Sequence, residues 1–282
     1  MPDRGAVIYR YDGSFAGFLS VVFASFEKKE QPVQIMSRDQ IQTVLFPIKE
    51  IETDKEKASR VRAGIRSRMS ENGWQKVRLG FDTCHPEKEL LLLRFIRLGM
   101  RLGKRVCWML ADDTVAELEN ALKHLTGEAH QYKGFVRFSE AGGVLAAVIE
   151  PKNRVLPLLA PHFSDRYANE AFLIFDKTHR EMLLYRPHRY VIIPVENYEL
   201  PLPGTEERLF RSLWKSYYET IGIKERENPR CRMGHMQKRY WKHLTEMDPD
   251  VPPRIDGQDG LPTDGHKLKD RIQLTDTADS SL

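Results

Sequence analysis

The sequence has few cysteines and lacks any long apolar run. Its three cysteines, Cys84, Cys107 and Cys231, lie far apart and form no Cys-x-x-Cys pair. An odd, scattered set argues against a disulfide framework, so we expect three reduced thiols and no cysteine-ligated metal. No stretch approaches the roughly 18 apolar residues of a membrane span, and the N-terminal MPDRGAVIYR lacks the apolar region of a signal peptide. We therefore expect a cytoplasmic protein with no membrane partner.

The common catalytic signatures are also absent. The chain contains no Walker-type phosphate loop, no Gly-x-Gly-x-x-Gly, no Gly-x-Ser-x-Gly and no His-Glu-x-x-His pattern. Nucleotide hydrolases, dinucleotide-dependent enzymes and zinc proteases thereby lose their usual sequence support. We predict no metal site and no cofactor within this chain.

Charge is distributed unevenly along the chain. The net charge is +4, but the segment 248–282 carries eight Asp against four Lys or Arg, so the preceding residues carry +8. A basic body favours a polyanionic partner, most often nucleic acid, although a generic basic surface explains the charge equally well. The acidic segment is rich in Pro, Gly, Ser and Thr, which predicts a disordered tail.

The stretch from His130 to Asp176 predicts a sheet with one short helix. Two β-type runs, Phe135–Phe138 and Val144–Ile149, flank a Gly-Gly pair that suits a hairpin turn. The segment Pro157–Tyr167 predicts a short helix that begins with proline, and Phe172–Phe175 predicts a third strand. Two further strands are expected at Met182–Tyr185 and Tyr190–Val195. The sequence thus predicts an α+β fold with a central antiparallel sheet of about five strands flanked by helices.

The N-terminal part predicts a mixture of helix and strand. Ser14 is positioned to cap a helix whose aromatic stripe runs from Phe15 to Phe26 and should be buried. Residues 30–53 show irregular chain with short extended pieces, such as Thr43–Phe46 and Ile48–Ile51. A charged helix is expected from Asp54 to about Met69, ended by Asn72-Gly73. Further helices are expected after Pro86 and over Thr114–Gln131, and Pro201, Pro203 and Gly204 mark a linker. We therefore divide the chain into a mixed region 1–80, a core of helices and sheet 81–200, a basic helical segment 201–247 and the tail 248–282.

Titratable side chains gather around the central block. A histidine that titrates near neutral pH, a carboxylate and an arginine could form an acid/base pair and a phosphate clamp. The candidate catalytic residues are His130, His162, Asp165, Arg166 and Asp176. A metal-dependent nuclease needs clustered carboxylates, for which Asp165 and Asp176 are the best pair. The alternative is that these groups cap the short helix and tie it to the strand ends.

Basic residues recur where a helix is expected after Pro86. Their three- and four-residue spacing places them on one helix face, which could follow a phosphate backbone or could be a solvated face. Near the C-terminus, basic residues surround two aromatic residues, a composition suited to phosphate contact and base stacking. The alternative there is that Trp241 and Leu244 dock this segment on the body. The candidate DNA-binding residues are Arg94, Arg97, Arg101, Lys104, Lys133, Arg137, Lys238, Arg239, Tyr240, Trp241 and Lys242.

Several long segments resemble a bacterial family assigned to DNA repair or DNA metabolism. They are HQYKGFVRF, VLPLLAPHFSDR, FLIFD, IKERENPRCRMGHMQKRYWKHL, YRYDGSFAGFLSVVFASFEKKE and ELLLLRFIRLGMRLGKRV. The resemblance covers roughly residues 5–247, with a core domain at about 86–247. One departure is Gln237, where the family pattern is expected to have proline. The resemblance carries over no catalytic residue.

The same resemblance implies partners. Family members are companions of a radical-SAM protein that acts on DNA, and any SAM or iron–sulfur cluster then belongs to that partner. The core domain also occurs fused to uracil-DNA glycosylase-like domains. We therefore expect a nucleoid-associated DNA-binding accessory factor. There are two alternatives. The first is an enzyme with a nuclease or base-processing activity that uses His162, Asp165 and Asp176. The second is a pure protein-interaction scaffold.

Overall fold

The computed structural model describes residues 7–40, 46–141 and 143–252. The α-helices are α1 (Phe15–Glu27), α2 (Lys55–Phe81), α3 (Lys88–Leu102), α4 (Asp113–Phe135), α5 (Leu156–Arg166), α6 (Thr205–Ile221), α7 (Pro229–His235) and α8 (Lys238–Trp241). Short 3-10 helices are η1 (Gly103–Trp108), η2 (Lys224–Arg226) and η3 (Thr245–Met247). The strands are β1 (Ile8–Tyr11), β2 (Gln34–Ser37), β3 (Ile48–Glu50), β4 (Ser139–Ala141), β5 (Val144–Ile149), β6 (Phe172–Asp176), β7 (Glu181–Arg186) and β8 (Arg189–Pro194). This arrangement confirms the α+β class.

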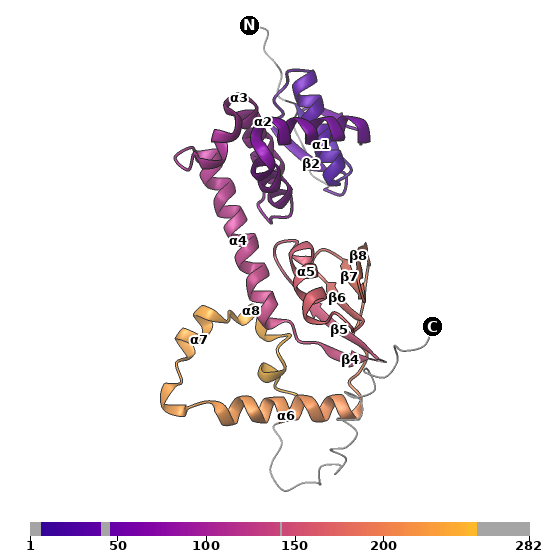
Figure 1. Ribbon diagram of the computed structural model, residues 1–282, viewed down its shortest axis with the longest axis vertical. Helices are drawn as coiled ribbons and strands as arrows, with labels where there is room; N and C mark the ends of the chain where they lie inside the picture. Colours follow the sequence, from indigo (N-terminus) through magenta and orange to yellow (C-terminus); the bar gives the residue numbers. More distant parts are fainter. Residues whose placement is uncertain (1–6, 41–45, 142, 253–282) are drawn as a thin grey trace, which may run out of the picture.

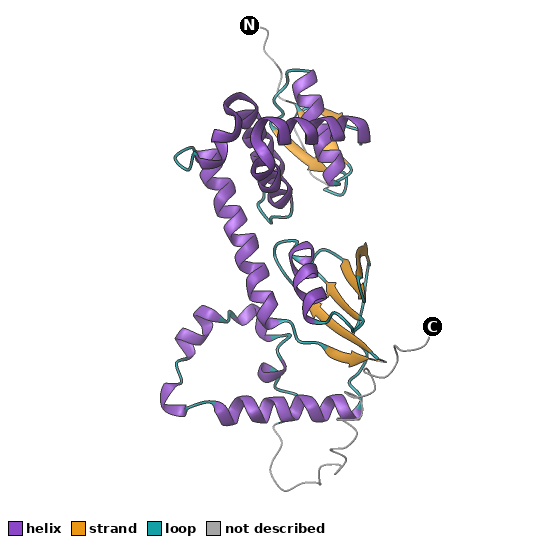
Figure 2. Ribbon diagram, in the orientation of Figure 1, coloured by secondary structure: helices purple, strands orange, loops and turns teal. Residues whose placement is uncertain are grey.

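The elements form an upper helical part and a lower part built on a sheet. Figure 1 shows α1, α2 and α3 gathered near the N-terminus, α4 running from them past the five-stranded sheet, and α6 beyond edge strand β4. Figure 2 shows that the upper part is mainly helical and that most of the strands lie beside the second half of α4. No helix among the described residues is long and apolar enough to cross a bilayer.

The N-terminal part contains a small parallel sheet in the order β2-β1-β3. Strand β3 lies within the predicted extended piece Ile48–Ile51, whereas no pattern predicted β2. Most of the other predicted piece, Thr43–Phe46, lies outside the described residues. Strand β2 is short, and its two central residues are both buried, so it lacks the alternation of buried and exposed residues that marks a strand in sequence. Helix α1 begins as predicted, with the Ser14 hydroxyl accepting a hydrogen bond from the Gly17 amide at 2.9 Å.

The first helix of α2 ends at Met69, as the sequence predicts. The chain turns at Ser70, which has φ 75° and ψ 174°, and a second helix, also part of α2, then runs through Asn72-Gly73 to Phe81. Gly73 is buried, and a Cβ placed on it would lie 2.7 Å from the Met69 Cβ. The glycine therefore serves close packing inside the helical part, and it is not a helix terminator.

Helix α4 connects two hydrophobic cores. Val115, Leu118 and Leu122 belong to the first core, formed with α1, α2, α3 and the small sheet. Leu125 and Ala129 belong to the second core, formed with β5, α5, β6 and β7. The prediction of a strand at Phe135–Phe138 is wrong, because α4 runs through Phe135 and β4 begins only at Ser139. The boundary between the regions 1–80 and 81–200 stays a prediction. The two cores meet along α4.

The second sheet is mixed, whereas the sequence predicted an antiparallel sheet. Its order is β4-β5-β6-β7-β8, and every neighbouring pair is antiparallel except β5 and β6. Helix α5 lies between β5 and β6 in the chain and returns it to the starting edge, so β6 runs in the same direction as β5. The expected glycine turn joins β4 to β5, with Gly143 at φ +82°.

The C-terminal part is helical, as predicted, and it folds back on the second core. Tyr240 and Leu244 are buried there, beside Tyr132 of α4. The predicted disordered tail lies outside the described residues from 253 onward. The structure thus places a segment far along the chain against α4 and the sheet.

Candidate nucleic-acid interface and polar junction

A strongly basic surface of the described chain lies on α2, α3 and η1. Residues 55–69 contain six basic residues and one acidic residue, and residues 94–105 contain five basic and none acidic. The Arg68 Nε donates to the Met100 carbonyl at 3.1 Å, which brings the first half of α2 against the end of α3. We call this surface the basic face; its exposed members are Arg60, Arg62, Arg66, Arg68, Arg94, Arg101, Lys104 and Arg105.

The basic stripe predicted on α3 is divided between exposed and internal residues. Arg94, Arg101 and Lys104 are exposed and make no hydrogen bond or ion pair within the described ranges. Arg97 points inward: its Nη2 donates to the Ser25 carbonyl at 3.0 Å and to the Ser25 hydroxyl at 2.6 Å. Arg97 therefore anchors α3 to the end of α1, and the other three remain available for a ligand.

Arg137 is also committed to an internal contact. Its guanidinium pairs with the Glu246 carboxylate at 2.7 Å and lies 5.8 Å from the Trp214 ring centre. Burial alone would raise the pKa of Glu246, but the hydrogen bonds from Arg137 and Trp214 outweigh burial and hold it below its ordinary value. Lys133, in contrast, is exposed on α4.

The basic-aromatic segment near the C-terminus docks on the body. The Tyr240 hydroxyl donates to Gln131 Oε1 at 2.6 Å, and its ring meets Tyr132 edge-on at 5.1 Å. Arg239 pairs with Glu128 at 3.1 Å, Lys242 pairs with Glu150 at 2.7 Å, and the Trp241 Nε1 donates to the Met236 carbonyl at 3.0 Å. Lys238 is exposed, with its Nζ 6.0 Å from the Trp241 ring centre. These contacts favour the docking alternative for most of the segment.

Three of the candidate catalytic residues, His162, Asp165 and Arg166, lie together near the end of α5. His162 is half-buried, and its Nε2 has no hydrogen-bond partner among the described atoms. Burial lowers the pKa of His162; the nearby charges of Lys133 and Arg166 lower it further, whereas Asp165 opposes them. His130 is exposed on α4, whereas Glu128 on the same helix is buried. The surroundings of His162 therefore favour a neutral imidazole that lies close to the cations Lys133 and Arg166.

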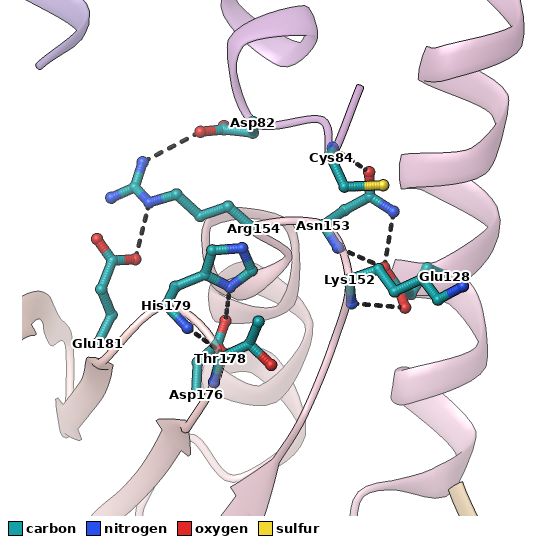
Figure 3. A network of polar contacts seen from close by, with 10 residues as sticks. All are labelled: Asp82, Cys84, Glu128, Lys152, Asn153, Arg154, Asp176, Thr178, His179 and Glu181. Atoms are coloured by element: carbon teal, nitrogen blue, oxygen red, sulfur yellow. Dashed lines mark hydrogen bonds and ion pairs between the residues drawn. The ribbon is translucent and has the colours of Figure 1, made fainter. Parts of the chain in front are cut away.

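Asp176 lies away from that group, at the far end of β6. The first residue of this strand, Phe172, packs against Tyr167 just after α5. Asp176 lies four residues further along the extended strand, which corresponds to about 13 Å. Asp176 is fully buried and accepts hydrogen bonds from the Thr178 and His179 amides and, at 2.7 Å, from the His179 Nδ1 (Figure 3). The fold thus pairs Asp176 with His179, which sequence reasoning did not select. Its only sequence signal is the Asp-x-x-His spacing in a turn after a strand.

A polar junction lies beside this pair, between the two cores. Arg154 bridges Asp82 and Glu181, and Asn153 links the Cys84 amide to Glu128 (Figure 3). The buried Glu128 carboxylate also accepts the Lys152 and Asn153 amides at 3.0 and 2.7 Å. The hydrogen bonds and ion pairs of these groups join the cores, which indicates a structural junction. Across the described ranges, no cluster of three or more His, Cys, Asp or Glu side chains could hold a metal ion.

Comparison with known proteins identifies the domain. No protein with a curated description matches the chain. A family model described as a domain of unknown function, DUF4130, matches residues 86–246, which is more than half of the chain and includes α3, α4, the second sheet and the docked C-terminal segment. The chain therefore belongs to the DUF4130 family.

Proposed function

We propose that this protein binds DNA as an accessory factor in DNA repair. The observation that carries the proposal is the basic face, where Arg94, Arg101 and Lys104 are exposed and have no internal partner among the described residues. Phosphate contacts by exposed Arg and Lys supply most of the sequence-independent affinity of proteins for DNA. The face joins two helices that pack in one core, so the core sets the backbone positions of its charges.

The biological setting of the proposal rests on the segment resemblance. By that resemblance, the protein belongs to a bacterial repair pathway, acts in the cytoplasm at the nucleoid and works with a radical-SAM protein. That partner would supply SAM and the iron–sulfur cluster, and this chain would present DNA to it or receive its product. A uracil-DNA glycosylase-like protein is a second candidate partner.

The test is DNA binding by the purified protein across a salt series, with single- and double-stranded DNA. We expect log affinity to fall linearly with log salt. The Arg101→Gln/Lys104→Gln variant should reduce the slope by about one for each phosphate that the protein no longer neutralises. The matched control is Arg186→Gln/Arg189→Gln, which removes two exposed charges at the turn between β7 and β8. No binding at low salt, or an equal effect of both variants, would overturn the proposal.

An enzyme acting on DNA is the second candidate, and a different observation favours it. The buried Asp176 carboxylate holds the His179 Nδ1 at 2.7 Å, while the His179 side chain is partly exposed. A carboxylate that fixes one ring nitrogen of histidine leaves the other free to accept a proton, as in general-base catalysis. Asp176 and His179 are therefore the residues to test, ahead of His162 and Asp165. His179→Ala should abolish cleavage or base release if the protein is an enzyme; an active His179→Ala variant would exclude this role.

A further inference from the structure

A small apolar groove opens at the edge of the basic face, between α1, α2 and α3. It has a volume of about 220 Å³ and is lined by Phe23 and Phe26 of α1, Arg60 and Gly64 of α2 and Met100 of α3, together with two valines. Phe26 is 39% exposed, although it belongs to the aromatic stripe that the sequence predicted to be buried. Gly64 keeps the groove open on the α2 side, where a Cβ would lie 3.6 Å from the Met100 methyl carbon.

Cationic groups surround this groove. The Arg60 guanidinium lies 5.1 Å and the Lys57 ammonium 5.4 Å from the centre of the Phe23 ring. The Arg97 guanidinium lies 5.0 Å from the centre of the Phe26 ring. Arg101 follows Met100 directly in α3 and is exposed. The groove therefore combines aromatic rings with positive charge, which is the composition of surfaces that stack bases and bind phosphates.

We infer that this groove takes one unpaired nucleobase of single-stranded DNA, with the neighbouring phosphates on Arg60 and Arg101. The inference rests on the proposed function and adds the state of the DNA that is recognised. The volume lies below the range of about 300–1,000 Å³ typical of pockets for larger ligands, so one ring system fits better than a row of side chains. The surrounding positive charge favours a polyanionic ligand over an apolar protein segment.

Duplex DNA cannot use the groove in the same way. In a duplex each base is stacked between its neighbours and only its edges are accessible from the grooves. A ring face becomes available to a phenylalanine only when the base is unpaired or extruded, and extrusion costs a few kcal/mol. The geometry therefore predicts tighter binding of single strands than of duplex at equal length and salt.

The test compares three ligands on the full chain by fluorescence anisotropy: labelled oligothymidine, a strand of equal length with abasic sites, and a duplex. Base–aromatic stacking is worth about 1–3 kcal/mol, so Phe26→Ala should weaken oligothymidine binding about tenfold. The same change should alter abasic-strand binding less than about twofold, because that strand has no base to stack. Phe26→Leu, which keeps an apolar side chain, should lose affinity similarly, whereas Phe26→Trp should retain it.

The control is Tyr190→Ala, which removes an exposed aromatic ring from β8 and should leave all three affinities unchanged. Unfolding midpoints of all variants verify that the fold is kept. Equal affinity for the three ligands, with no effect of Phe26→Ala, would overturn the inference and leave the proposed function intact. No binding of any ligand would overturn the proposed function itself. A further possible outcome is that the protein binds polyglutamate and that Phe26→Ala abolishes this binding. That result would identify an acidic polypeptide as the occupant of the groove and would also overturn the inference.

Discussion

Arg154 and Asp82 join the two cores through one ion pair, with the Arg154 Nη1 3.1 Å from the Asp82 Oδ1. The Arg154 amide also donates to the Asp82 carbonyl at 2.9 Å, so the same two residues are held by backbone and side chain. Asp82 follows α2, whereas Arg154 precedes α5 and also binds Glu181 at 2.7 Å (Figure 3). The contact therefore links the helical part of the molecule to the second sheet.

Removal of this ion pair should destabilise the protein. Arg154→Met leaves the buried Asp82 carboxylate with Arg78 as its remaining ionic partner. Breaking a fully buried ion pair costs about 3–5 kcal/mol; because Arg154 is 34% exposed and Arg78 remains, we expect about 2 kcal/mol. Urea unfolding of the two proteins measures the difference. Arg186→Met, at an exposed site on β7, should change stability by less than about 0.5 kcal/mol. Equal effects of the two changes would contradict the assigned role.

Arg97 and Arg101 should behave differently although they lie one helical turn apart. Arg97→Gln removes the charged donor from the carbonyl and hydroxyl of Ser25 and should lower stability by about 2 kcal/mol. It should leave the salt dependence of DNA binding unchanged. Arg101→Gln should leave stability unchanged and reduce the salt dependence of DNA binding. Chemical denaturation and the salt series together decide this, and a salt slope reduced by Arg97→Gln would show that Arg97 contacts phosphate.

Glu246 should contribute stability that is lost in acid. Its folded pKa is lowered by Arg137 and Trp214 against the opposing effect of burial, while an unfolded glutamate has a pKa of about 4.3. The stabilisation is therefore complete above about pH 4.3 and disappears as pH falls through the folded pKa. The difference in unfolding midpoint between wild type and Glu246→Gln should be constant near neutral pH and shrink in acid. Glu196→Gln, at an exposed site, should show no such pH dependence.

Ser70 should carry backbone strain inside α2. Its φ of 75° and ψ of 174° fall in a region that only glycine adopts readily. Ser70→Gly should therefore raise the free energy of unfolding by about 1 kcal/mol. Ser67→Gly, in the regular part of the same helix, should lower it by about 0.5 kcal/mol because glycine is the poorer helix former there. Destabilisation by both changes would show that Ser70 is unstrained.

Local sequence patterns determined most helices and strands β5, β6, β7 and β8 of the second sheet. The Ser14 cap and the apolar spacing of α1 predicted that helix correctly, since capping and periodicity act over a few residues. The turn at Gly143 before β5 was likewise readable, because a tight turn needs a residue that accepts positive φ. These features depend only on near neighbours in the chain.

Tertiary structure decided which of these residues remain available for function. Spacing placed Arg97 and Arg101 on one helix face, yet only packing of α3 against α1 commits Arg97 to the interior. The path of the chain through α5 and β6 holds His162 away from Asp176, which pairs locally with His179 instead. The parallel pairing of β5 and β6 likewise required the crossover through α5. Such outcomes depend on contacts between segments far apart in the chain, and no local pattern encodes them.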